Sequence, residues 1–145
     1  MGVKMYRYLL ASFLVAMLGA CQSLPEQDEN LYLALGGKDG ITQIINIFIY
    51  EIGETEEAVK HFEHTDLDRF REKAIEHICM LTGGPCEYTG EEMQPVHQGM
   101  NITESEFNEI TNAMIYALDA KDVSIGNRNR LLAIIAAMRD DIIYQ

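Results

Sequence analysis

The sequence predicts an all-α domain, and three observations lead to this prediction. Apolar residues recur at spacings of three and four through most of the chain, which is the period of one helix face. Glycine and proline residues lie between these periodic stretches, where they end helices and begin turns. No stretch alternates convincingly between apolar and polar residues, as a half-buried strand would. Removing an N-terminal leader from the 145 residues leaves enough chain for one modest core.

Four helices follow from these patterns, taken in chain order. The second begins after Thr65 or Asp66, either of which can cap a helix start. The third begins at Thr103, which forms with Glu106 the Thr-x-x-Glu pattern of a capping box. The apolar positions that mark the four faces are Ile41, Ile44, Ile45, Phe48 and Ile52; Leu67, Phe70, Ala74, Ile78 and Leu81; Phe107, Ile110, Met114 and Leu118; and Leu131, Ile135, Met138 and Ile142.

The amino terminus has the pattern of a secretory signal peptide over residues 1–20. Lys4 and Arg7 form a short basic region, and the apolar run that follows, residues 8–18, is too short to span a bilayer comfortably. The run ends in small residues directly before Cys21. These residues are therefore expected to direct export and not to belong to the folded domain, which we place at residues 31–145.

The sequence Leu-Gly-Ala-Cys at residues 18–21 resembles a bacterial lipobox. The resemblance implies cleavage before Cys21, lipidation of that cysteine, and a tether over residues 21–30. Gln22, which follows, implies sorting to the outer membrane, so that the domain would face the periplasm at the cell envelope. The alternative is an ordinary signal peptide with a cysteine at this position by chance.

The charge of the chain excludes one class of partner. The net charge is −12, and removal of residues 1–20 takes away Lys4 and Arg7 but no acid, which makes it −14. So acidic a surface repels nucleic acid and anionic lipid headgroups. We therefore expect no nucleic-acid partner, and membrane attachment only through the lipid on Cys21.

The segment GGPCEYTGEEMQPVHQGMNIT, residues 83–103, contains the most specific motif in the chain. Leu31-Tyr32 and Leu35-Gly36-Gly37 precede it in the same fixed order and spacing, as do Phe48 and Phe62, and Phe107 follows it. Over nearly all of residues 31–143 this pattern resembles the group 1 truncated haemoglobins, the two-over-two globins. The resemblance implies a b-type haem and reversible binding of O2 or another diatomic gas, such as NO or CO.

The same resemblance implies that His97 is the protein ligand of the haem iron. Iron requires a neutral imidazole nitrogen, with the other ring nitrogen held by a backbone or carboxylate partner. Taken alone, such a histidine is more commonly an ordinary surface or core residue. The other positions that the family pattern places around the haem are Phe48, Ile49, Phe70, Lys73, Ala74, Ile78, Tyr88, Met93, Val96, Ile102 and Phe107.

The first of the four predicted helices, which carries Ile41 to Ile52, departs from the family pattern. An ungapped match from Gly36-Gly37 places Ile49 where the family usually has a tyrosine that donates to bound O2, and Tyr50 comes one residue later. Tyr50 would lie about 180° from the apolar stripe of its helix, so we expect it to point away from the haem. A shift of the helix by one residue is the alternative. With Phe70 and Ala74 above the iron, the pocket is expected to be mostly apolar.

Several polar residues have two interpretations each. Lys73 matches a position that supplies a sixth iron ligand in some relatives, or it pairs with a haem propionate. Tyr88 and Arg71 are further candidates to approach a propionate, and of the two only Tyr88 matches the family motif. His77 either lines the pocket or packs in the core with a satisfied nitrogen.

His61 and His64 have a spacing that could serve one metal, with surface histidines as the alternative. Cys79 and Cys86 remain after lipidation of Cys21, and they form either a short disulfide or, at Cys79, a buried thiol.

Two functions from different classes fit the sequence. One is a haem module that binds O2 or another gas at the envelope. The other is a non-haem helical lipoprotein that serves as an interaction platform. No catalytic residues are assigned, because no Ser/His/Asp arrangement, phosphate-binding glycine loop or paired-carboxylate motif stands out. The haem function is compatible with NO dioxygenase-type or peroxidase-type activity, and NO dioxygenation would also need a reductant from an unknown electron donor. A haem spectrum separates the two functions.

Overall fold

The structure, a computed structural model, describes residues 30–145, and every regular element in that range is a helix. One parallel bridge, between Ile102 and Ile143, is the sole β-pairing among these residues. The all-α prediction is therefore confirmed. Cys21 and the predicted signal peptide lie outside the described residues. The elements are α2 (Leu31–Ala34), α3 (Gly37–Gly53), η1 (Ala58–Phe62), α4 (Leu67–Leu81), α5 (Met93–His97), α6 (Glu104–Ala120), α7 (Ile125–Ala137) and η2 (Arg139–Asp141).

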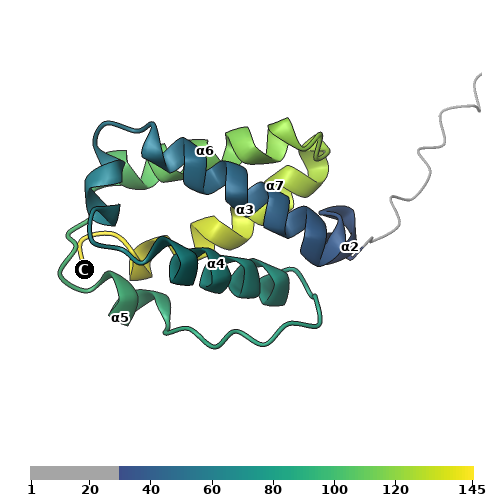
Figure 1. The fold of residues 1–145 in the computed structure, drawn as a ribbon, viewed down its shortest axis with the longest axis horizontal. Coiled ribbons are helices and arrows are strands. Elements are labelled where there is room, and N and C mark those ends of the chain that lie inside the picture. The colour runs from purple at the N-terminus through teal and green to yellow at the C-terminus, as the bar shows by residue number, and fades with distance from the viewer. Residues whose placement is uncertain (1–29) are drawn as a thin grey trace, which may run out of the picture.

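Helix α3 is central to the arrangement, because it packs against α6 and also against α4 (Figure 1). Helix α7 contacts both α6 and the short α2. Two helix pairs, α3 with α4 and α6 with α7, thus meet through α3 and α6. The segment between α4 and α5, residues 82–92, runs beside α4 as an extended loop, which we call the strap (Figure 1). Across residues 30–145, none of the helices combines the length and apolar character needed to cross a bilayer.

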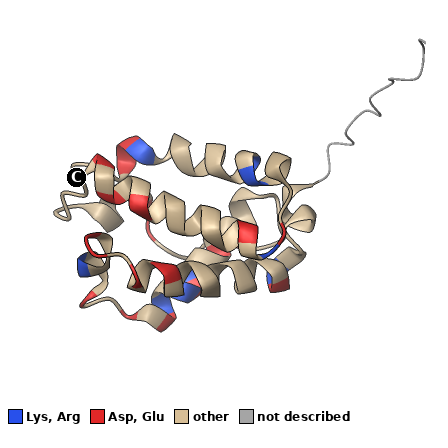
Figure 2. Cartoon of the chain, turned by 90° about the horizontal axis from the view of Figure 1, so that it is seen from above, with Lys and Arg blue, Asp and Glu red and all other residues tan. Residues whose placement is uncertain are grey.

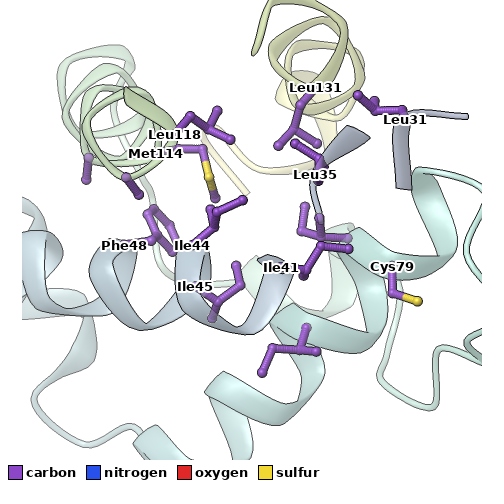
Figure 3. Packing of buried hydrophobic residues seen from close by; sticks show 14 of the residues in the cluster. Leu31, Leu35, Ile41, Ile44, Ile45, Phe48, Cys79, Met114, Leu118 and Leu131 are labelled. Atoms are coloured by element: carbon purple, nitrogen blue, oxygen red, sulfur yellow. The ribbon is translucent and has the colours of Figure 1, made fainter. Parts of the chain in front are cut away.

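The core lies where α3 meets its neighbours (Figure 3). Ile41, Leu118 and Leu131 are fully buried there, and they come from α3, α6 and α7. Each large aliphatic side chain buried in this way stabilises the fold by about 1.5–3 kcal/mol relative to an exposed one. The apolar stripe predicted on α3 is confirmed, since all five of its positions are buried: Ile41, Ile44, Ile45, Phe48 and Ile52.

The helix ends follow from local side-chain chemistry. The predicted capping box is present: Thr103 accepts from the backbone N–H of Glu106, and the Glu106 carboxylate accepts from the backbone N–H of Thr103. Of the two predicted caps for α4, Asp66 is the one used, and it accepts from the backbone N–H of Arg69 at 3.0 Å. After α4, Gly83 takes a φ of 84°, in the left-handed region that glycine enters at little cost.

Two boundaries differ from the sequence prediction. The last helix was expected to continue to Ile142, but α7 ends at Ala137 and a short 3-10 turn follows. Asp140 and Asp141 are unfavourable at a helix C-terminus, where the macrodipole is negative, and Arg139 pairs with Glu104 of α6. In addition, Met93–His97 forms one helical turn, α5, which is not among the four helices predicted from the sequence.

Candidate functional site

A cavity of about 600 Å³ lies between α3, α4, α5 and α6, with the strap along one edge. This volume is within the usual range of sites for cofactors and small molecules. Its walls are mainly apolar and aromatic, with a few polar groups at the rim. Acidic and basic positions occur on several helices and on the segments between them (Figure 2). The cavity is therefore the feature on which a site can be built.

His97 lines this cavity from the C-terminal end of α5. Its Nδ1 lies 2.7 Å from the carbonyl oxygen of Met93, one turn earlier. A carbonyl oxygen only accepts, so Nδ1 carries the proton and the lone pair is on Nε2. Burial lowers the pKa of His97, a trend that the Met93 carbonyl opposes and the nearby His61 reinforces. The ring is therefore a neutral imidazole, held by one backbone bond, with a free nitrogen for a metal.

The face of the cavity opposite α5 is apolar. Phe48 of α3 and Phe70, Ala74 and Ile78 of α4 line it, as the family pattern implied. Phe70 meets Phe62 of η1 edge to face, with ring centroids 5.2 Å apart. Such aromatic edges and faces suit a flat apolar ligand.

On the α5 side, three further residues that the family pattern places around the haem line the cavity: Met93, Val96 and Phe107. Ile102 lies with them among the lining residues. Val96 is 44% exposed, so it forms part of the rim and not of the floor. Ten of the eleven predicted haem contacts thus line a single cavity together with His97.

Ile49 is the exception among the predicted contacts. It is not among the residues that line the cavity, and it packs against the main core instead. Ile45, one turn earlier on α3, lines the cavity in company with Phe48. The expectation for the neighbouring tyrosine is confirmed, since Tyr50 is 66% exposed and points away from the cavity. No tyrosine of α3 therefore reaches the apolar face.

The rim beside the strap holds the cationic and phenolic groups. Arg69, Lys73 and Tyr88 all line it. The Tyr88 ring stacks on His77 with centroids 4.4 Å apart, and its hydroxyl donates to the carbonyl of Glu91 at 2.7 Å. Arg71, the other propionate candidate, instead donates to Asn46. The residue pattern gave no sign that Arg69 lines the cavity, although it lies one turn before Lys73 on α4.

The two interpretations of His77 are settled in favour of the cavity. His77 lines it, and burial lowers the pKa of the imidazole. Burial therefore favours the neutral form of the ring, which stacks on Tyr88.

One interpretation of His61 was an ordinary surface histidine, and the structure does not support it. Its side chain is 15% exposed, lines the cavity, and donates from Nε2 to the Glu106 carboxylate at 3.1 Å. Lys60 and Thr103 bind the same buried carboxylate. His64 is exposed, and no cluster of three metal-ligating side chains occurs within residues 30–145, so the pair gains no metal site from the structure.

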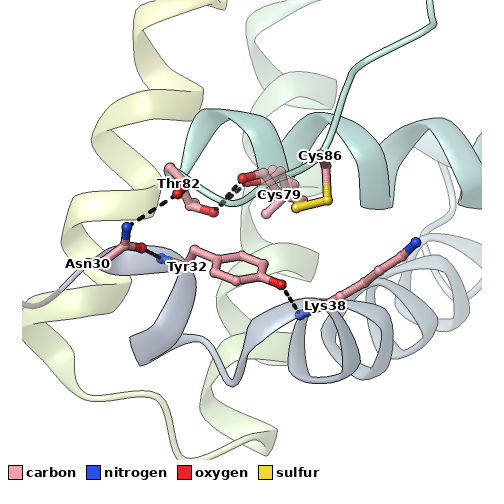
Figure 4. The surroundings of a disulfide bond; sticks show 8 residues. Asn30, Tyr32, Lys38, Cys79, Thr82 and Cys86 are labelled. Atoms are coloured by element: carbon pink, nitrogen blue, oxygen red, sulfur yellow. Dashed lines mark hydrogen bonds between the residues drawn. A yellow bond between two sulfur atoms is a disulfide. The ribbon is translucent and has the colours of Figure 1, made fainter.

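The strap is fixed to α4 by a disulfide between Cys79 and Cys86 (Figure 4). Cys79 is fully buried, and Gly84 donates to its carbonyl oxygen at 2.8 Å. A side chain at Gly84 would collide with both Tyr32 and Cys79, which explains a glycine there. The disulfide alternative for these cysteines is thus the one that the structure shows.

The fold and the cavity together define a globin. A family model described as bacterial-like globin matches residues 30–144, and the chain belongs to that family. Within it, the chain is a truncated, two-over-two globin, a class of haem protein that binds diatomic gases.

Curated relatives agree with this assignment. The group 1 truncated hemoglobin of Tetrahymena pyriformis is 29% identical over 116 residues, which is 79% of this chain and 95% of the relative. Group 1 truncated hemoglobin GlbN of Mycolicibacterium paratuberculosis is 28% identical over 113 residues, covering 78% of this chain and 83% of that protein.

Solved structures show the same fold. The Fe(III) form of the truncated hemoglobin of Tetrahymena pyriformis superposes with a TM-score of 0.77 at 26% identity, over 79% of this chain and 98% of that one. The 2/2 hemoglobin of Synechococcus sp. PCC 7002, with covalently attached heme, gives 0.74 at 21% identity over 79% and 98% of the two chains. At that identity the second likeness is evidence for the fold alone.

Proposed function

We propose that this globin holds a b-type haem in the cavity through Nε2 of His97 and binds O2 or another diatomic gas on the opposite, apolar face. The observation that carries the proposal is the neutral His97 ring, fixed by the Met93 carbonyl at 2.7 Å with its free nitrogen on a cavity of about 600 Å³. When bound, the haem supplies an iron centre that takes up diatomic gases reversibly.

The residues present fit a haem chemically. Aromatic and aliphatic side chains form both walls, and they exclude water from a flat apolar ring. At the rim, the Arg69 guanidinium offers donors for the carboxylates that a b-type haem presents, and Lys73 adds a positive charge beside it. The alternative function, a non-haem platform, gives no reason for a neutral, backbone-fixed histidine on such a cavity.

An absorption spectrum tests the haem proposal. The purified chain is mixed with hemin, and spectra are recorded in the ferric state, after reduction, and with CO. A strong Soret band that shifts on reduction and again with CO supports the proposal. If hemin remains unbound, with the spectrum of free hemin in buffer, the proposed function is wrong.

We further propose that the domain is attached to the cell envelope by lipid on Cys21, facing the periplasm from the outer membrane. Cys21 lies outside the described residues, so the support comes from the residue pattern at 18–21 and from the Cys79–Cys86 disulfide, which oxidising compartments favour. Metabolic labelling with a fatty acid should mark the wild-type chain and not Cys21→Ser. Equal labelling of both would contradict the lipid anchor.

A further inference from the structure

Lys73 is engaged by the strap and by its own helix in a way that neither sequence interpretation anticipated. Its Nζ lies 2.6 Å from Oγ1 of Thr89, and 3.0 and 3.1 Å from the two carboxylate oxygens of Glu76. Glu76 also accepts from the backbone N–H of Thr89 at 3.1 Å and from its hydroxyl at 2.9 Å. Lys73, Glu76 and Thr89 thus form a closed set of hydrogen bonds between α4 and the strap.

This arrangement determines what Lys73 can do in the cavity that it lines. The hydrogen bond to Glu76 is the largest influence that raises the pKa of Lys73, and Glu72 adds to it. An ammonium group has three donors and no lone pair, so it cannot bind a metal until it loses a proton. A lysine held in this way stays charged and stays on the strap.

We propose that Glu76 is a positioning residue that holds Lys73 against Thr89 and so keeps the lysine from occupying the sixth position of the haem iron, which is left to the gas. The inference rests on the proposed function, since it assumes iron bound at His97. It assigns a role to a carboxylate that does not line the cavity.

The other charged groups around Lys73 support the choice of Glu76. On α4, the Glu72 carboxylate lies 3.5 Å from Nζ of Lys73 and its side chain is 65% exposed. The Glu76 side chain is only 21% exposed, and both of its carboxylate oxygens accept from Nζ of Lys73. Arg69 lies one turn earlier on the same helix, and from the strap Tyr88 interacts electrostatically with both Lys73 and Glu76. Glu76 is the one carboxylate that binds Lys73 and the strap together, so its removal frees the lysine.

The experiment compares holoproteins that carry Glu76→Gln, Glu72→Gln, Lys73→Met, and Glu76→Gln with Lys73→Met. Glutamine keeps the shape of Glu76 but removes its charge. Spectra of the ferrous, gas-free proteins are recorded at neutral pH and at about pH 9, closer to the ordinary lysine pKa of about 10.4. We expect five-coordinate spectra throughout, except that Glu76→Gln gains a low-spin, six-coordinate fraction that grows with pH. CO should then bind more slowly to that variant, because the lysine has to leave first.

A second readout does not depend on iron. Acetylation of Lys73 at about pH 9, measured by mass spectrometry relative to the exposed Lys38, should be several-fold faster in Glu76→Gln than in the wild type.

Three results would overturn the inference: an unchanged spectrum in Glu76→Gln, a low-spin fraction that persists when Lys73 is methionine, or a wild-type low-spin spectrum that Lys73→Met abolishes. A Soret band that is absent from every protein in the series would instead contradict haem binding itself. The two failures are therefore distinguishable.

Discussion

Opening the Cys79–Cys86 disulfide is a perturbation whose magnitude follows from the geometry of the strap. The bond closes a loop with a sequence separation of 7. For a loop of this size, the chain-entropy relation gives about 2.5 kcal/mol of stabilisation, chiefly by restricting the unfolded chain. Cys86→Ser is the suitable variant, because it opens the bond and leaves the fully buried sulfur of Cys79 in the core.

The folded strap should remain in place without the disulfide. Gly84 still donates to the Cys79 carbonyl, Tyr88 still stacks on His77, and Thr89 still donates to Glu76. We therefore expect the free energy of unfolding to fall by about 2–3 kcal/mol, while the Soret band keeps its position. Faster transfer of haem to an apoglobin acceptor would show whether the strap also limits haem release.

Urea unfolding of the holoprotein with and without a thiol reductant measures this prediction. The reductant should bring the wild type to the stability of Cys86→Ser and leave the variant unchanged. The reasoning is refuted if Cys86→Ser loses less than about 0.5 kcal/mol, or if the reductant destabilises the variant as much as the wild type.

Two further predictions concern Glu106 and Tyr50. The hydrogen bond from Lys60, followed by those from Thr103, holds the pKa of the Glu106 carboxyl well below its ordinary 4.5. The charged form is therefore favoured in the folded state, so this stabilisation is present above about pH 4.5 and is lost as the pH falls further. Glu106→Gln should lower the free energy of unfolding, measured by urea titration, by about 2–3 kcal/mol at neutral pH and by less at acid pH. An equal loss of unfolding free energy at the two pH values would contradict this prediction. Tyr50→Phe should leave the rate of O2 dissociation from the ferrous protein within about twofold of the wild type, because Tyr50 is 66% exposed. If O2 dissociates about tenfold faster while CO dissociation is unchanged, the Tyr50 hydroxyl donates to the bound gas and the prediction is wrong.

The residue patterns predicted the parts of this fold that depend on neighbours in sequence. The buried stripe of α3, the Thr103 capping box and the outward position of Tyr50 each follow from the period or chemistry of one helix. The gathering of ten predicted contacts around His97 followed from the family resemblance. Their roles toward a haem stay predictions, which the experiments above address.

Contacts between distant segments could not be read from the patterns. The Lys73–Thr89 bond joins residues 16 apart, and the His61–Glu106 bond joins residues 45 apart. Each requires a side chain to turn toward a partner that only the folded chain supplies. Ile49 lies outside the cavity for a related reason. Contacts with two distant helices, α4 and α6, determine which face of α3 meets the cavity.

The most direct test of the central claim, that His97 holds the haem, is the absorption spectrum of His97→Ala beside that of His64→Ala. His64 is exposed, so its replacement controls for the loss of a histidine. We expect His64→Ala to match the wild type in the ferrous CO state, and His97→Ala to retain little haem until free imidazole is added. A wild-type ferrous CO spectrum in His97→Ala without imidazole would contradict the assignment.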